Sequence, residues 1–174
     1  MKRASLLFLA AALAAPALAS SEDLLECTTQ EVTPAFRGTI ADAMLAEDSP
    51  ETDTLFAQLA TVAETCAGRH GLAKDKGEAY FAYSIARLPH DDFTVRLGDL
   101  GISVAVLDEA LDFGPGRTNP VISGRLSQVQ VERIVAALEA NGAAVGTIPQ
   151  TSWELVGAYA AATSLMWQAR AKLP

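Results

Sequence analysis

The residues best suited to recognise another molecule lie in a Gly- and Pro-rich stretch, 113–125. This stretch contains Arg117, Asn119, Ser123 and Arg125 and no acidic residue. Arginine and asparagine side chains, and backbone N–H groups exposed by glycine, all donate hydrogen bonds to anions. Irregular connections longer than about 12 residues are uncommon in compact domains and are often functional. One hypothesis is that the stretch contacts an anionic ligand or an acidic patch on a partner. The interpretation that we favour is an ordinary link between helices whose arginines pair with surface carboxylates.

Aromatic residues form a second candidate site. Tyr80, Phe81 and Tyr83 lie within one helical turn, and Trp153 and Trp167 fall at helical spacing near the C-terminus. Aromatic side chains that converge between helices can line a small-molecule cavity. The same spacing is typical of an ordinary helical core, so both interpretations stay open.

No pattern predicts a catalytic or metal centre. The histidines, His70 and His90, are twenty positions apart and belong to no cluster with metal-ligand spacing. We expect His90 to be an exposed loop residue before a helix that Asp91 or Asp92 caps. The acidic run 47–53 lacks the spacing and the glycine of a calcium loop. We predict no catalytic residue, no metal and no cofactor, with a carboxylate-dependent hydrolase as a remote alternative.

The two cysteines, Cys27 and Cys66, predict a disulfide. They form no C-x-x-C redox motif, and an even pair in an exported chain is most simply a bridge. In the chain-entropy model, closing the loop between Cys27 and Cys66 stabilises a fold by roughly 4 kcal/mol. Cys66 falls on the apolar stripe of its helix, so the bridge would tie that helix to the first one.

The N-terminus has the features of an export signal. Lys2 and Arg3 precede an apolar run of about ten residues, and Ala17-Leu18-Ala19 supplies the small residues that a signal peptidase accepts. We therefore predict a signal peptide over 1–19 and a single mature domain over 20–174. The expected location is periplasmic or secreted.

Charge is unevenly distributed. The chain has 13 basic and 21 acidic residues, which gives a formal net charge of −8. Residues 20–53 contain nine acidic residues and a single basic one, Arg37. This balance argues against nucleic acid, because no basic stripe is present to neutralise phosphates. It favours a basic protein partner attracted by electrostatic steering.

Helix-start signals divide the mature chain into about six to eight helices. Thr33-Pro34 and Ser49-Pro50 each place a capping hydroxyl before a proline at the first helical position. Thr151-Ser152-Trp153-Glu154 has the pattern of a capping box. Pro89 is expected to end a helix that begins near Glu78.

The segment 91–107 has three possible structures. Its apolar residues fit one continuous helix, a hairpin at Gly98-Asp99, or two helices interrupted at Gly101. We favour the interrupted helix, because a glycine in the left-handed conformation commonly ends a helix and Ile102 would then pack back on the preceding turn.

Together these signals predict an all-α, compact multi-helix bundle with one disulfide. No apolar stretch after residue 19 is long enough to span a bilayer. Small residues along the 151–169 helix offer a surface for dimerisation. The expected function is non-enzymatic binding, to a protein partner first and to a small molecule between helices second.

Overall fold

The computed structural model describes residues 21–46 and 50–174, and every regular element in these ranges is helical. Seven α-helices and two short 3-10 helices occur there, which confirms the predicted all-α bundle. The predicted signal segment 1–19 and the predicted cap Ser49 lie outside the described residues. The elements are α1 (Ser21–Glu31), α2 (Pro34–Leu45), α3 (Pro50–Arg69), η1 (Lys74–Lys76), α4 (Gly77–Asp99), α5 (Val104–Leu111), α6 (Gln128–Ala140), η2 (Val145–Thr147) and α7 (Gln150–Arg170).

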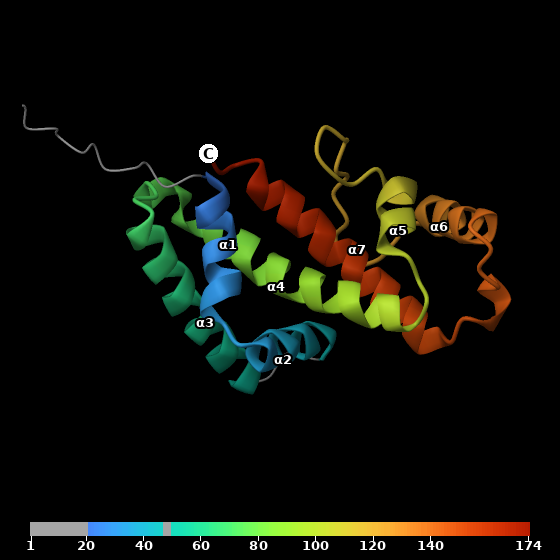
Figure 1. The fold of residues 1–174 in the computed structure, drawn as a ribbon, viewed down its shortest axis with the longest axis horizontal. Coiled ribbons are helices and arrows are strands. Elements are labelled where there is room, and N and C mark those ends of the chain that lie inside the picture. Colours follow the sequence, from blue (N-terminus) through green and yellow to red (C-terminus); the bar gives the residue numbers. More distant parts are fainter. Residues whose placement is uncertain (1–20, 47–49) are drawn as a thin grey trace, which may run out of the picture.

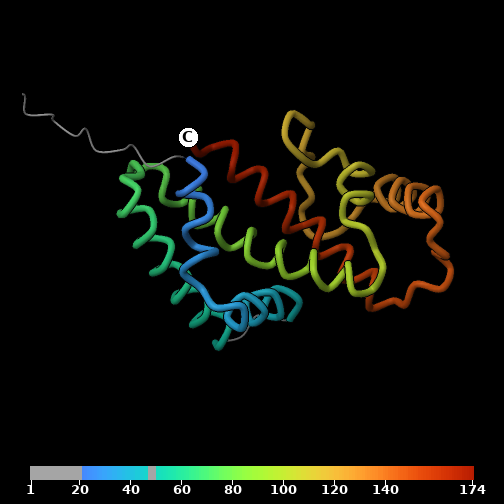
Figure 2. The backbone as a smooth tube through the Cα atoms, in the orientation of Figure 1, coloured from blue at the N-terminus to red at the C-terminus, as the bar shows by residue number. Residues whose placement is uncertain are grey.

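The two longest helices, α4 and α7, lie side by side through the middle of the molecule (Figure 1). Helices α1, α2 and α3 pack against α4 at one end, and α5 packs against α6 at the other. Both α4 and α7 contribute buried side chains to the apolar clusters at each end. The backbone returns to the region where the described chain begins, so the C-terminal end of α7 lies beside the beginning of α1 (Figure 2).

The predicted disulfide is confirmed. Cys27 on α1 is bonded to Cys66 on α3, with 5.9 Å between their Cα atoms. Beside it, the hydroxyl of Tyr80 on α4 donates a 2.7 Å hydrogen bond to the carbonyl of Leu24 and contacts the Thr28 hydroxyl at 3.0 Å. The bundle therefore holds α1 covalently to α3 and by buried hydrogen bonds to α4.

The prediction that Pro89 ends a helix is wrong. Pro89 is buried inside α4, which continues for ten more residues to Asp99. Proline removes one backbone hydrogen bond and crowds the carbonyl four residues earlier, at a cost of about 3 kcal/mol or more in a helix interior. Leu88, Phe93 and Leu97 are fully buried on either side of it, and their packing offsets that cost.

The interrupted helix over 91–107 is confirmed, and the continuous helix and the hairpin are wrong. Gly101 has a φ of 74°, and the Ile102 N–H donates to the Leu97 carbonyl at 2.9 Å. The Gly101 N–H donates to the Gly98 carbonyl, which completes a Schellman motif. Helix α5 then begins at Val104.

Helix caps are partly as predicted. The Thr33 hydroxyl accepts a hydrogen bond from the Phe36 N–H at 3.1 Å, as expected. The predicted capping box at 151–154 is wrong, because α7 begins at Gln150 and has no side-chain cap. A complete capping box occurs at α6 instead, between Ser127 and Gln130.

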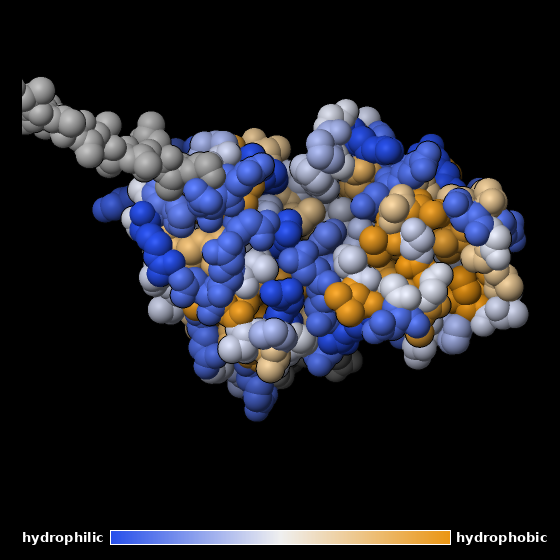
Figure 3. Space-filling model, viewed as in Figure 1, coloured by the Kyte–Doolittle hydropathy of each residue, from blue (hydrophilic) through white to orange (hydrophobic). Residues whose placement is uncertain are grey.

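The surface in Figure 3 is mostly hydrophilic over α1–α3 and carries more hydrophobic residues toward α5 and α6. Within 21–46 and 50–174, no helix combines the length and the apolar character that crossing a bilayer requires. Helix α7 buries ten of its residues inside the bundle. Its small residues Gly157, Ala158 and Ala161 are half-buried, so dimerisation through 151–169 stays a prediction.

Candidate functional site

The predicted binding stretch is an ordered loop between α5 and α6. Asp112 and Asn119 adopt left-handed conformations, with φ of 59° and 48°. The Asn119 N–H donates to the Asp112 carbonyl at 3.0 Å, and the Asn119 side chain both accepts from the Gly114 N–H and donates to its carbonyl. Asparagine tolerates this backbone conformation better than most residues. The side chain of Asn119 therefore closes the loop.

The loop is also fastened to α7. The Ser164 hydroxyl accepts a hydrogen bond from the Ile122 N–H at 2.8 Å and donates one to the Pro120 carbonyl at 2.9 Å. One turn further, the Gln168 amide donates to the Asn119 carbonyl at 2.9 Å. These contacts satisfy three backbone groups of a segment that has no secondary structure of its own.

A cleft of about 600 Å³ lies where this loop meets the C-terminal end of α7. Among the described residues that line it, the charged side chains are Arg117 from the loop and Arg170 from the last turn of α7. Trp167 contributes an aromatic wall. We call this site the loop–helix cleft, and its lining residues are Arg117, Thr118, Asn119, Trp167, Gln168, Arg170, Ala171 and Leu173.

Both arginines keep donor capacity for a ligand. The side chain of Arg117 is 42% exposed, and its Nη1 lies 3.8 Å from Asp112 Oδ1. Asp112 also accepts hydrogen bonds from Thr118, and these lower the pKa of its carboxyl. Arg170 uses Nη1 to bind the carbonyls of Leu173 and Pro174, which leaves Nε and Nη2 without a recorded partner among the described residues. A guanidinium has five N–H donors, so one or two contacts do not saturate it.

The three sequence-predicted residues divide into two groups. Arg117 and Asn119 line the loop–helix cleft, whereas Arg125 is exposed and does not line it. Asn119 acts mainly by shaping the loop. Sequence reasoning missed Arg170, and it assigned Trp167 to the separate aromatic candidate site. Arg170 lies in the last turn of its helix, where the helix dipole alone favours a basic residue. Its position in the sequence therefore did not indicate a binding site.

The predicted aromatic cavity is only partly assembled. Tyr83 and Trp167 line a pocket of about 370 Å³ between α1, α4 and α7, together with Leu25 and Met166. The other members are dispersed through the core. Tyr80 is buried against α1, and Phe81 packs against the apolar cluster of Ile40, Leu59 and Leu88. Trp153 packs against a different apolar cluster, to which α5 and α6 contribute.

The acidic segment is partly neutralised by contacts within the bundle. Glu26 lies 3.2 Å from Arg87, and Asp42 lies 2.7 Å from Arg96. Glu31 contacts Arg69. Fewer carboxylates are therefore available to a basic partner than the sequence suggests, and such a partner stays a prediction.

His90 is not the exposed loop residue that the sequence predicts. It lies inside α4, half-buried, with its ring 5.2 Å from that of Tyr159, and its Nδ1 contacts Asp91 at 3.1 Å. Burial raises the pKa of Asp91, but hydrogen bonds with His90 and Arg87 outweigh it and hold the pKa below its ordinary value. Burial raises the pKa of Asp108, which accepts a 2.8 Å hydrogen bond from Tyr159. None of these groups lines the loop–helix cleft.

In the part of the chain that the structure describes, no three His, Cys, Asp or Glu side chains are grouped so that they could hold a metal ion. The fold and the cleft define a class, an all-α bundle with one disulfide and a basic cleft at one end. Comparison with protein-family models, curated proteins and solved structures finds no match to this chain.

Proposed function

We propose that the protein is an exported binding protein whose loop–helix cleft holds a small organic anion. One observation carries the proposal: in a chain with a formal net charge of −8, the charged side chains that line this cleft, among the described residues, are two arginines from separate elements. Two converging cations in an otherwise acidic protein attract a ligand of opposite charge.

The chemistry of the lining favours an organic anion over an inorganic one. Guanidinium groups bind carboxylate and phosphate through paired hydrogen bonds. A volume of about 600 Å³ exceeds what a bare inorganic anion fills and lies within the range of small-molecule sites. Trp167 offers an aromatic face against which a ring can stack. An aromatic or heterocyclic phosphate or carboxylate combines these features.

Export is supported by the chemistry of the chain. Disulfides persist in oxidising compartments and are rare in the cytosol of mesophiles. The Cys27–Cys66 bridge and the predicted signal segment therefore agree with a periplasmic or secreted protein.

Calorimetric titration with phenyl phosphate tests the binding proposal. Arg117→Glu should weaken binding by about tenfold or more, because it replaces a charge-assisted hydrogen bond with repulsion. Arg125→Glu changes the net charge equally but lies outside the cleft, so it is the matched control and should change affinity by less than about twofold. Equal losses in the two variants, or no binding to the wild-type protein, would reject the proposal.

A further inference from the structure

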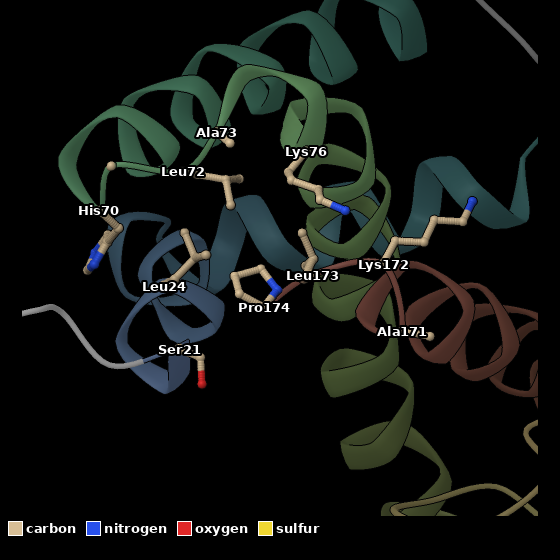
Figure 4. A pocket seen from close by; sticks show the side chains of 11 residues that line it. Ser21, Leu24, His70, Leu72, Ala73, Lys76, Ala171, Lys172, Leu173 and Pro174 are labelled. Atoms are coloured by element: carbon tan, nitrogen blue, oxygen red, sulfur yellow. The ribbon is translucent and has the colours of Figure 1, made fainter.

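A second cavity, of about 500 Å³, lies at the same end of the bundle on the other side of the chain segment 171–174. Its walls come from the start of α1, the turn between α3 and α4, and this final segment. Figure 4 shows Leu24, Leu72, Leu173 and Pro174 gathered at its centre. We call it the terminal cavity.

The terminal cavity has an apolar centre and a basic edge. His70 lies on one side of the leucines, and Lys76 and Lys172 extend on the other (Figure 4). No acidic side chain is among its lining residues. Asp75 and Glu78 line an adjoining hollow with the two lysines, but no ion pair to either lysine is recorded within the described residues. The ammonium groups, on flexible four-carbon stems, can therefore turn toward an anion at the edge.

The disulfide holds two walls of the terminal cavity together. Leu24 lies three residues before Cys27 on α1, and His70 follows Cys66 by four residues at the end of α3. Leu24 packs in the same apolar cluster as both cysteines, and the His70 N–H donates to the Cys66 carbonyl at 3.0 Å. The apolar centre is thus covalently supported, which reduces the ordering cost of binding.

We infer that the terminal cavity binds an amphipathic anion, a free alkyl-chain carboxylate or its sulfate equivalent, with its chain against the leucines and its head between Lys76 and Lys172. This site shares Ala171 and Leu173 with the loop–helix cleft, but its charged residues are different and it requires a different ligand. The leucine centre accommodates the chain, and the two lysines at the edge favour a head of negative charge.

Calorimetric titration with hexanoate, octanoate and decanoate as monomers tests the apolar part of the inference. Affinity should rise about threefold to fourfold for each added methylene until the cavity is filled. Decyltrimethylammonium, with the same chain and the opposite charge, should bind at least about tenfold more weakly than decanoate. Affinity that does not depend on chain length, or equal binding of the cation, would overturn the inference.

Charge reversal tests the head-group site. Lys76→Glu should weaken decanoate binding by about tenfold, and Lys172→Glu should act in the same direction. Lys74→Glu, in the same short helix but outside the lining, is the matched control and should have less than about twofold effect. Circular dichroism and thermal unfolding should show that all three variants fold. Equal effects at Lys74 and Lys76 would contradict a specific site.

Two further measurements separate this inference from its alternatives. Arg117→Glu should leave decanoate binding unchanged, and Lys76→Glu should leave phenyl phosphate binding unchanged, so either site can fail without the other. Sedimentation with phosphatidylglycerol vesicles distinguishes a free ligand from a membrane surface. Protein that sediments with vesicles but does not bind monomeric decanoate would overturn the inference.

Discussion

Where α1 and α2 pack against α4, Arg87 and Arg96 of α4 each lie within 3.2 Å of a carboxylate of α1 or α2. At the C-terminal end of α7, Arg170 contacts backbone carbonyls, and Lys172 has no recorded carboxylate partner among the described residues. The same residue types therefore have different roles. Paired cations support packing between helices, whereas cations that border a cavity without a strong partner are available to a ligand.

The supports of the two regions differ as well. The α1–α3 end has a covalent bridge and buried hydroxyl contacts, while the 112–127 loop depends on hydrogen bonds from Asn119, Ser164 and Gln168. Covalent cross-links act largely on the unfolded chain, and hydrogen bonds act on the folded one. Substitutions in the two regions should therefore lower the free energy of unfolding by different amounts.

The largest effect is expected at the disulfide. Replacing Cys27 and Cys66 with serine should lower the free energy of unfolding by about 4 kcal/mol, because the unfolded chain regains the entropy of an open loop. Urea unfolding of the variant and the oxidised wild type measures the difference. A loss below about 1 kcal/mol would show that the bridge is not a principal support of the α1–α3 end.

A smaller loss is expected where the loop meets α7. Ser164→Ala should cost about 1–3 kcal/mol, because it removes the partner of the buried Ile122 N–H and of the Pro120 carbonyl. Ser123→Ala, at an exposed position of the same loop, is the control and should change stability by less than about 0.5 kcal/mol. Urea unfolding measures both, and equal losses would contradict the anchoring role of Ser164.

The half-buried carboxyls of Asp91 and Asp108 should make stability depend on pH with opposite signs. The folded-state pKa of Asp91 is lowered, so its contribution is present above the ordinary pKa of 3.8 and is lost as pH falls through the folded value. The pKa of Asp108 is raised, so its contribution is lost as pH rises. Asp91→Asn should therefore flatten the acid-side loss of stability, and Asp108→Asn should steepen it. Urea unfolding between about pH 3 and about pH 7 measures how the free energy of unfolding depends on pH in each variant. If both variants change this slope in the same direction, the assignment is contradicted.

The smallest effect is expected at an exposed ion pair. The side chains of Glu31 and Arg69 are 43% and 52% exposed, so solvent screens their attraction. Glu31→Gln should change the free energy of unfolding by less than about 1 kcal/mol. Thermal unfolding at low and high salt measures the change, and a larger loss would show that the α1–α3 end relies on its surface charges.

The fold was predictable where local chemistry acts alone. The cap at Thr33 and the turn at Gly101 follow from short-range patterns, and the disulfide follows from the presence of two cysteines in a chain predicted to be exported. The prediction failed at Pro89, because buried neighbours stabilise a helix that its own sequence disfavours. It also failed at the start of α7, where Pro149 precedes the helix and the capping-box pattern is unused.

Only one of the two arginines of the loop–helix cleft could be predicted from the sequence. Arg117 stands out because its loop is long and free of acidic residues. Arg170 lies more than fifty positions away, and only packing of the loop onto α7 brings it to the same cleft. Without that long-range contact, the sequence could not distinguish Arg170 from Arg125 as the second cation.

The two tryptophans provide the most direct test that the loop–helix cleft binds an organic anion. Trp167 lines the cleft, whereas Trp153 is not among its lining residues. Titration of ¹⁵N-labelled protein with phenyl phosphate, followed through the two indole N–H signals, compares these positions in one molecule. We predict a saturable shift of the Trp167 signal with an unchanged Trp153 signal, and loss of that shift in Arg117→Glu. An unmoved Trp167 signal, or equal shifts of both signals, would contradict the account.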